Sequence, residues 1–561
     1  MIRRILAAAL LVGALVLSAC SGLPTSGPVN AGAPADGTPT TPDFAFRPNS
    51  PQPGATPEQI VAGFLDAQTS PENSWRIARE FLTTGFEAQW QPTAGVTVDQ
   101  PGSRRTVATE AEEEAEITLT VTVIADVDET GAYNVSEPAE SILPYTLEQE
   151  NGEWRISSAP EGVVLERDFF ADVYRPYSLM YYDPTWTSLV PDVRWFAYRS
   201  QAVTTWIASA LIGGSPSPWL AGSVQSAFPD EVALAGPSVT VDSRGAAQVE
   251  LTDAALQATP ETQSRMQRQL EATLRSAGIA DADMLVNGTV LDVLPAPVQS
   301  TAIEPWPLVM VDGVVGYLTG DGLASLGSAM SAEVAAATPD ALALGRAGEV
   351  AAVRAADGVV SRVTAEGRAV VDERAGIVSP TIDAEGFVWT VPALTPAALQ
   401  AVGADGVIHA VAGAWPLATR VHAVRVSREG TRIAAIVSEA GRDWIVAAGI
   451  IRDAAGVPVS LGDQIHVARL DASGYALDWL DDHTLGVLVR TEDTTRVLTQ
   501  TVGGLGSATT APLGEIVMIA AGSGVAVPRV LDAEGTLFTR RGSTWTQAAT
   551  EIQVLGTQVG G

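Results

Sequence analysis

The sequence predicts a multidomain protein in which two α+β regions precede an all-β region built as a β-propeller. Its 561 residues are enough for three or more domains at about 150 residues each. Two regions before residue 294 combine helical hydrophobic spacing with strand alternation, whereas the remainder carries many short strand patterns and no strong helix. A strand–turn–strand unit recurs in that last part, which favours about six propeller blades.

The N-terminal residues 1–19 are typical of a signal peptide. Arg3 and Arg4 precede an apolar run that is shorter than the about 20 residues needed to cross a bilayer. The run ends in LSAC, which resembles a bacterial lipobox, and its last residue, Cys20, is the only cysteine. An ordinary signal peptide with an accidental cysteine is the alternative. We predict that Cys20 is lipidated with palmitate-type chains and anchors the protein in the cell membrane.

Residues 20–55 are predicted to form a proline-rich tether. The prolines in and next to this segment are Pro24, Pro28, Pro34, Pro39, Pro42, Pro48, Pro51, Pro53 and Pro57. Such a segment cannot bury a core and is partly stiff, so it would hold the folded part about 30–90 Å from the membrane.

Residues 56–175 are predicted to form the first α+β domain. The stretch TPEQ at 56–59 is a helix-capping signature, and apolar residues follow it at helical spacing. A second helix is expected near Glu72–Leu82, and alternation over Ile117–Val123 indicates a strand. Asn151-Gly152 predicts a type I′ hairpin. Tyr145 and Leu147 on its first strand are expected to face Trp154 and Ile156 on its second strand. Helices followed by a strand meander resemble the cone-shaped NTF2-like fold.

Residues 182–294 are predicted to fold in the order β-α-β-β-α-β. The stretch SLVPDVRWF reads as a strand, and an amphipathic helix over Val203–Leu211 stops at Gly213-Gly214 and Pro216. A hairpin about Asp242–Gly245 and a helix that starts at Thr259-Pro260 and ends near Gly278 follow, and MLVNG closes the unit. This order resembles the GerMN domain of secreted bacterial proteins.

Residues 297–561 are predicted to form the propeller. A degenerate strand–turn–strand unit recurs at steps of 38, 44, 53 and 52 residues, close to the usual blade length of about 40–50 residues. Its turns are marked by these residues: Gly348, Gly386, Gly430, Asp482-His483 and Gly535. Each copy matches the inner hairpin of a blade. A β-sandwich of irregular strands is the alternative.

Composition excludes several function classes. The net charge is −32, and no basic stripe exists that could displace counterions from nucleic acid, so we expect no nucleic-acid partner. All basic residues are arginine, which excludes the P-loop lysine and Schiff-base lysines. One cysteine excludes an internal disulfide and thiolate metal sites. We predict no metal or cofactor site at the four histidines: His409, His422, His466 and His483.

One motif resembles a calcium-binding loop. Residues 126–137, DVDETGAYNVSE, place oxygen-bearing side chains at EF-hand positions. The stretch before it alternates as a strand, however, and Glu137-Pro138 disfavours an exiting helix. A hairpin turn at Glu129–Gly131 explains the same residues. The acidic run Glu110–Glu116 is interpreted as a solvated charge run.

The order of parts, and three local stretches, resemble the actinobacterial lipoprotein LpqB family. The stretches are FLTTGFEAQW (81–90), YYDPTWTSLVPDVRWF (181–196) and LIGGSPSPWLAGSVQSAFP (211–229). The resemblance implies an accessory protein of the MtrA–MtrB two-component pathway that contacts the extracytoplasmic sensor region of the MtrB histidine kinase and influences cell-envelope homeostasis and division.

The residues themselves favour a non-catalytic, membrane-tethered binding protein on the extracytoplasmic face. The sequence has neither a Gly-x-Ser-x-Gly nor a Gly-x-Gly-x-x-Gly motif, and the first two regions have no histidine. We therefore assign no catalytic residue. The alternatives are an extracytoplasmic enzyme or carbohydrate-binding protein acting on cell-wall polymers, and a scaffold for other envelope proteins. A cluster of exposed aromatics lining the central mouth of the propeller would favour sugar binding.

Overall fold

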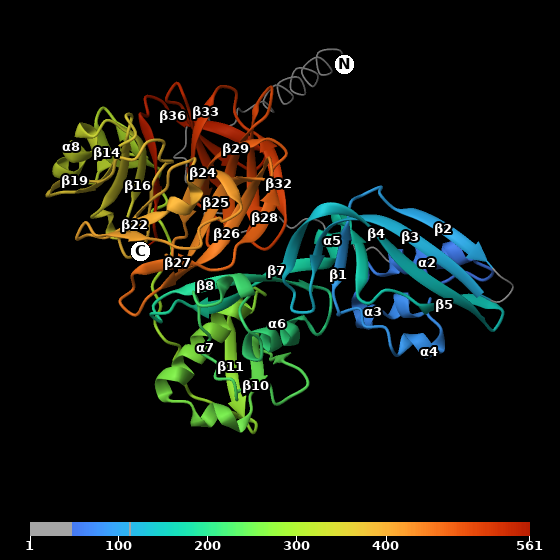
Figure 1. Ribbon diagram of the computed structural model, residues 1–561. Helices are drawn as coiled ribbons and strands as arrows, with labels where there is room; N and C mark the ends of the chain where they lie inside the picture. Colours follow the sequence, from blue (N-terminus) through green and yellow to red (C-terminus); the bar gives the residue numbers. More distant parts are fainter. Residues whose placement is uncertain (1–47, 111–113, 561) are drawn as a thin grey trace, which may run out of the picture. The chain divides into compact units, whose positions relative to one another are not determined.

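The computed structural model describes residues 48–110 and 114–560 (Figure 1). The predicted signal peptide, Cys20 and most of the tether lie outside the described residues, as does part of the Glu110–Glu116 run. No helix in the described ranges is long and apolar enough to cross a membrane.

The first domain combines short helices with a curved six-stranded sheet. Its strands run in the order β5-β4-β3-β1-β6, and β2 pairs with β3. Helix α2 packs its apolar side against the sheet, so that Ile60 and Phe64 are buried together with Ile117. The elements are α2 (Pro57–Ala67), α3 (Glu72–Arg79), α4 (Thr84–Glu87), β1 (Val96–Asp99), β2 (Arg105–Glu110), β3 (Glu114–Val127), β4 (Tyr133–Glu150), β5 (Glu153–Ser158), β6 (Val163–Glu166) and α5 (Arg167–Val173).

Local signals in this domain are confirmed with two differences. Thr56 and Gln59 form the predicted capping box, and Asn151 (φ 58°) and Gly152 (φ 80°) form the predicted turn. In the register of that hairpin Leu147 faces Ile156, but Trp154 faces Gln149 rather than Tyr145. Helix α3 also ends earlier than predicted, and its residues 73–75 are left-handed.

The second domain contains two separate sheets and two main helices. Strands β7 and β8 pair antiparallel, and a four-stranded sheet runs in the order β12-β11-β10-β9, with β10 and β11 parallel. The predicted strand SLVPDVRWF is β8, whereas β7 was not predicted. The elements are β7 (Tyr174–Tyr182), β8 (Leu189–Ala197), α6 (Val203–Ile212), η1 (Pro218–Leu220), β9 (Thr240–Val241), β10 (Ala246–Glu250), η2 (Asp253–Gln257), α7 (Pro260–Arg275), β11 (Asp281–Val286) and β12 (Thr289–Val290).

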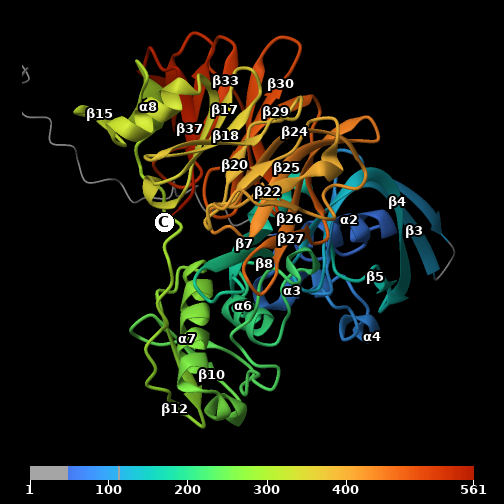
Figure 2. The same ribbon diagram turned by 60° about the vertical axis from the view of Figure 1, so that its left-hand side comes forward.

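The third domain is a propeller with six blades in the described residues (Figure 2). Its innermost strands, β37, β16, β20, β24, β29 and β33, contact one another in a ring. The last strand, β37, pairs with β13 and so completes the first blade. The blades are β37 with β13–β15, β16–β19, β20–β23, β24–β27 with β28, β29–β32, and β33–β36.

The strands of the first three blades are β37 (Val554–Gln558), β13 (Leu308–Val311), β14 (Val314–Thr319), β15 (Gly322–Ser325), β16 (Pro339–Leu344), β17 (Ala351–Ala355), β18 (Val360–Thr364), β19 (Gly367–Asp372), β20 (Thr381–Ile382), β21 (Val388–Thr390), β22 (Gln400–Val402) and β23 (Ile408–Ala410). Those of the last three are β24 (Ala418–Val426), β25 (Arg432–Glu439), β26 (Arg442–Arg452), β27 (Pro458–Leu461), β28 (Ile465–Arg469), β29 (Ser473–Trp479), β30 (Thr484–Arg490), β31 (Thr495–Thr501), β32 (Gly506–Thr510), β33 (Ile516–Ala521), β34 (Pro528–Asp532), β35 (Leu537–Arg541) and β36 (Thr544–Ala549).

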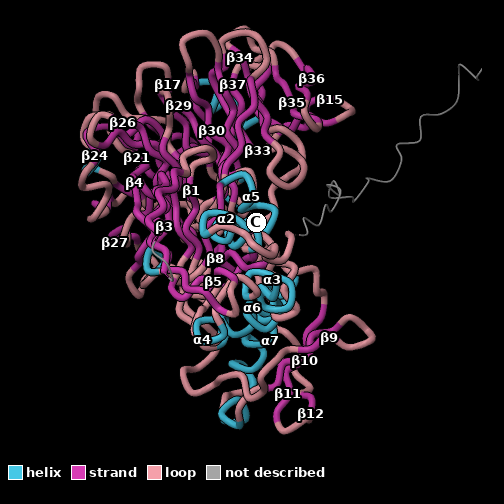
Figure 3. Tube along the Cα trace, turned by 90° about the vertical axis from the view of Figure 1, so that its right-hand side faces the viewer, coloured by secondary structure: helices cyan, strands magenta, loops and turns pink. Residues whose placement is uncertain are grey.

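Four of the five sequence repeats mark the inner hairpins of blades, as predicted. The fifth, at Gly535, instead joins the second and third strands of the last blade. Gly430 and Gly535 have the same left-handed φ of 82°, a backbone conformation that glycine adopts without the steric cost of a Cβ. The propeller also contains a helix that was not predicted, α8 (Ser328–Ala336). Figure 3 shows that strands otherwise dominate this part of the chain.

Candidate functional site

Strand β8 contacts all three domains. The backbone N–H of Trp195 donates to the carbonyl of Gly131 in the N-terminal domain at 2.7 Å. The indole N–H of Trp195 donates to the carbonyl of Gly503 in the propeller at 2.8 Å. The Arg432 guanidinium of the propeller reaches the carbonyl of Pro191 at 3.4 Å. We call this meeting point the β8 junction.

A buried ion pair forms the centre of the β8 junction. The Asp192 and Arg194 side chains are 2% and 4% exposed, and Arg194 Nη2 lies 2.8 Å from Asp192 Oδ2. Ser217 donates to Asp192 through its backbone N–H (2.8 Å) and its hydroxyl (2.7 Å). Arg194 Nη1 donates to both the carbonyl and the hydroxyl of Thr130. Burial opposes the charge of Arg194, but the Asp192 carboxylate outweighs it and raises the pKa of the guanidinium.

The loop that resembled an EF-hand is the turn between β3 and β4. Oδ1 of Asp128 accepts hydrogen bonds from the backbone N–H groups of Thr130 and Ala132 and from the Thr130 hydroxyl. These hydrogen bonds form a hairpin turn, as the alternative to a calcium loop predicted. The turn lies against β8, where Gly131 accepts the hydrogen bond from Trp195. Within residues 48–110 and 114–560, no group of three or more acidic, histidine or cysteine side chains is placed to hold a metal ion.

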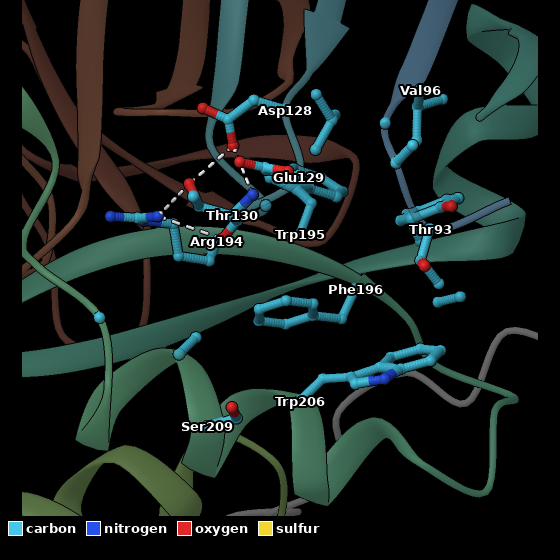
Figure 4. A pocket seen from close by; sticks show the side chains of 18 of the residues that line it. Thr93, Val96, Asp128, Glu129, Thr130, Arg194, Trp195, Phe196, Trp206 and Ser209 are labelled. Carbon is cyan, nitrogen blue, oxygen red and sulfur yellow. Dashed lines mark hydrogen bonds between the residues drawn. The ribbon is translucent and has the colours of Figure 1, made fainter. Parts of the chain in front are cut away.

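A pocket of about 560 Å³ lies beside this turn, between the N-terminal and second domains. The turn residues 128–131 form one wall, residues 91–96 a second, and β8 with α6 a third. Figure 4 shows the rings of Phe196 and Trp206 on the side of β8 and α6. The Gly213-Gly214 pair after α6 also lines this pocket, which we call the junction pocket.

The second domain meets the propeller along a seam at β26. A Cβ placed on Gly449 would lie 2.2 Å from the Ser223 hydroxyl and 3.1 Å from the carbonyl of Trp219. Only glycine therefore permits the backbone approach seen here. Apolar residues of the two domains, such as Leu211 and Leu485, belong to one continuous buried cluster.

The N-terminal domain also touches the propeller directly. Glu137 of β4 forms an ion pair with Arg442 of β26, and this hydrogen-bonded guanidinium lowers the pKa of Glu137. A smaller cavity of about 360 Å³ lies where the three domains meet, between Tyr133, Trp219 and Ile465. These contacts join the three domains at several independent points.

The histidines do not form a catalytic arrangement. His422 Nε2 lies 2.7 Å from the Ser438 hydroxyl and 3.4 Å from Asp443 Oδ1, and Ser438 donates to the same carboxylate at 2.6 Å. A Ser–His–Asp triad instead needs the carboxylate on the other ring nitrogen. Burial lowers the pKa of His422. His466 pairs with Glu439 at 2.8 Å and packs against Trp444.

The sequence predicted the strand that forms the β8 junction but not the junction itself. Asp192 and Arg194 are charged residues within an otherwise apolar strand pattern, which was the available signal. Thr130 was singled out only as part of the calcium-loop-like motif, and Trp206 only as part of the helix over Val203–Leu211, because their role at the junction depends on which segments meet in space. Cys20, the one predicted site residue, lies outside the described ranges.

Comparison with protein families supports the domain order. Residues 50–171 match the model "Lipoprotein LpqB, N-terminal domain". Residues 178–292 match the Germane model, described as "Sporulation and spore germination". Residues 313–554 match the model "Lipoprotein LpqB beta-propeller domain".

Curated relatives are also described as "Lipoprotein LpqB". Lipoprotein LpqB of Bifidobacterium longum is 30% identical over 396 residues, which are 67% of this chain and 66% of the relative. That of Mycobacterium bovis is 27% identical over 491 residues, or 79% of each chain. The alignments to the Rhodococcus jostii and Cutibacterium acnes relatives cover 40% and 49% of those proteins, so the chain spans about half of their length.

Solved structures are only distantly similar. TolB from Acinetobacter baumannii has a TM-score of 0.33 at 9% identity and covers 45% of this chain and 66% of its own. Likeness at this level supports no conclusion about the present chain. The family models and the curated relatives do support a conclusion, which is that the chain belongs to the LpqB lipoprotein family.

Proposed function

We propose that this protein is a non-catalytic, lipid-anchored protein on the extracytoplasmic face of the cell membrane, where it binds and modulates the sensor region of a two-component histidine kinase. The β8 junction is the observation that carries this proposal. Its charged groups are fully engaged with one another, so they serve to hold three domains in one arrangement rather than to act on a substrate. A fixed arrangement presents a composite surface to a protein partner with little loss of conformational entropy.

The family resemblance is the basis for proposing a kinase partner. This partner can be tested directly. Photo-crosslinking groups are placed on the propeller and on the second domain of the membrane-bound protein, and the captured proteins are identified by mass spectrometry. The proposal expects a histidine-kinase sensor domain among them. Recovery of no such domain, while the kinase is present in the same membranes, rejects this partner.

Anchoring through Cys20 has a separate test. A lipobox cysteine receives more than one acyl chain, and stable membrane attachment requires more than one such chain. We expect Cys20→Ala to move the protein from the membrane fraction to the soluble extracytoplasmic fraction. Ser21→Ala, next to it, is the matched control and is expected to stay membrane-bound. Retention of the Cys20→Ala protein in membranes contradicts the proposal.

A further inference from the structure

We propose that the junction pocket binds a neutral saccharide. Its volume of about 560 Å³ lies within the range of about 300–1,000 Å³ found for small-molecule sites, which occur preferentially at domain interfaces. The inference concerns a small ligand and does not depend on the kinase proposed above, so each can fail while the other holds.

The aromatic lining of the pocket suits a sugar ring. Phe196 and Trp206 are half-buried and line the cavity from β8 and α6 (Figure 4). Sugars carry C–H groups on the faces of their rings and hydroxyls around the edge, so they stack on aromatic rings while their edges accept and donate hydrogen bonds. A tryptophan of this kind normally directs its N–H to a partner. Among the described residues, the Trp206 indole N–H has no hydrogen-bond partner.

The polar lining is suited to hydroxyl groups rather than to ions. Gln91, Thr93, Ser209 and Ser215 are exposed along the pocket and offer amide, hydroxyl and backbone groups. A ligand can therefore be held by several neutral hydrogen bonds around an aromatic centre, which is the usual construction of a specific small-molecule site.

The charged groups of the pocket disfavour an acidic ligand. The Arg194 guanidinium is occupied by Asp192 and Thr130, and Asp128 is occupied by its own turn. Glu129 is exposed on the same turn, and its carboxylate has no partner among the described side chains. A carboxylate or phosphate on the ligand would be repelled by Glu129 without compensation from a free cation, which selects a neutral saccharide.

The inner wall is held in a strained conformation. Asn73, Ser74 and Trp75 have φ values of 50°, 57° and 59°, in the left-handed region that residues other than glycine rarely adopt. Trp75 lines the pocket, and its indole N–H donates to the carbonyl of Gln68 at 3.0 Å. Strain of this kind persists where the surrounding structure imposes it, commonly at ligand-binding sites.

Titration of the purified full-length protein with chitotriose and maltotriose, followed by isothermal titration calorimetry, tests the proposal. We expect saturable binding of a neutral trisaccharide that Trp206→Leu weakens by about tenfold or more, because one stacking face is lost. Trp306→Leu is the matched control, since Trp306 is exposed at 45% and lies outside the pocket. It is expected to leave the affinity unchanged.

Two further variants keep the test decisive if Trp206→Leu impairs folding. Ser209→Trp fills the pocket from an exposed position of α6 and is expected to abolish binding while the circular dichroism spectrum stays native. Glu129→Gln is expected to strengthen binding of the acidic trimer trigalacturonate and to leave the neutral trimers unaffected. Failure of both neutral trimers to bind at millimolar concentration, or binding that survives Ser209→Trp, overturns the proposal.

Discussion

Single buried charges determine how the domains are held together. Asp192 is buried but receives two hydrogen bonds from Ser217 in addition to the Arg194 guanidinium, so its lone pairs are satisfied. Such a pair gives little net stability over an apolar pair of the same shape, but removing one partner strands the other charge. The β8 junction is therefore sensitive to single substitutions.

Arg194→Met is expected to destabilise the protein by about 3–5 kcal/mol, because Asp192 is left buried without its cation. Urea denaturation monitored by circular dichroism measures this loss. Arg244→Met is the matched control: Arg244 also bridges carboxylates, but its side chain is 69% exposed, and exposed pairs contribute about 0–1 kcal/mol. Equal effects of the two substitutions would contradict the role assigned to Arg194.

Asp478 on the inner strand β29 is a buried carboxylate whose negative charge is less well compensated by its neighbours than that of Asp192. Its Oδ1 lies 3.9 Å from Arg425 Nε, and its Oδ2 accepts from the backbone N–H of Ala521 at 2.9 Å. Burial raises the pKa of Asp478 to about 6, against the lowering effect of Arg425 and Arg428. The folded state therefore holds its proton at pH values where the unfolded state has lost it.

The stability of the protein is expected to fall as pH rises from about 4 to about 6, and Asp478→Asn is expected to remove this part of the dependence. Between those limits the native protein should lose about 2–3 kcal/mol relative to the variant. Urea midpoints collected across this pH range measure the difference. Asp292→Asn, at an exposed position, should run parallel to the native protein, and a flat difference for Asp478→Asn would show the raised pKa to be wrong.

At the scale of elements, the β3–β4 turn is shaped by its contact with β8. Gly131 has a φ of 84°, and a Cβ there would lie 3.0 Å from the carbonyl of Trp195. The glycine thus serves both the turn and the close approach of two domains. Gly152 has a similar φ of 80° in the β4–β5 turn, but nothing lies within 4 Å of its Cβ position.

This pair of glycines allows the two effects to be separated. Both Gly131→Ala and Gly152→Ala are expected to cost about 1 kcal/mol for the left-handed backbone. Gly131→Ala alone should also lengthen the Trp195–Gly131 hydrogen bond and speed hydrogen exchange in β8. Mass-spectrometric exchange over residues 189–197 measures this, and unchanged exchange in Gly131→Ala would indicate that the junction tolerates a methyl group.

Elements governed by local chemistry could be predicted from the sequence, and those governed by packing could not. The Thr56 capping box and the Asn151-Gly152 turn follow from the residues themselves, because their backbone groups are satisfied within a few positions. Strand β7 was missed because its register is set by β8. Helix α8 was missed because its run of Ala and Ser shows no hydrophobic periodicity.

At the scale of the whole molecule, the seam at β26 fixes the second domain against the propeller. Gly449→Leu is expected to cost about 1–3 kcal/mol, because its side chain must displace Ser223 and Trp219 from a packed contact. Limited proteolysis should then cut near residues 217–224, which the native protein protects. Gly320→Leu is the matched control, since its Cβ position is open. Protection of that loop in Gly449→Leu would contradict the assigned seam.

The junction pocket could not be predicted because its walls come from distant parts of the chain. Thr93, Thr130 and Trp206 belong to two domains and meet only after both have folded. The fold class, by contrast, could be predicted from the sequence. The spacing of hydrophobic residues indicated the helices and strands, and the recurring turn residues indicated the propeller. Motifs report a local conformation, whereas a site between domains is a property of the packing.

The pairing of β37 with β13 also sets an order of events in time. A ribosome completes β13 more than 200 residues before β37, so the first blade exposes an unpaired strand edge throughout that interval. Ring closure therefore cannot precede the synthesis of β37, which lies after all other strands of the propeller in the described residues. A chain that lacks β37 would thus keep nearly all of its propeller strands and still have no closed ring.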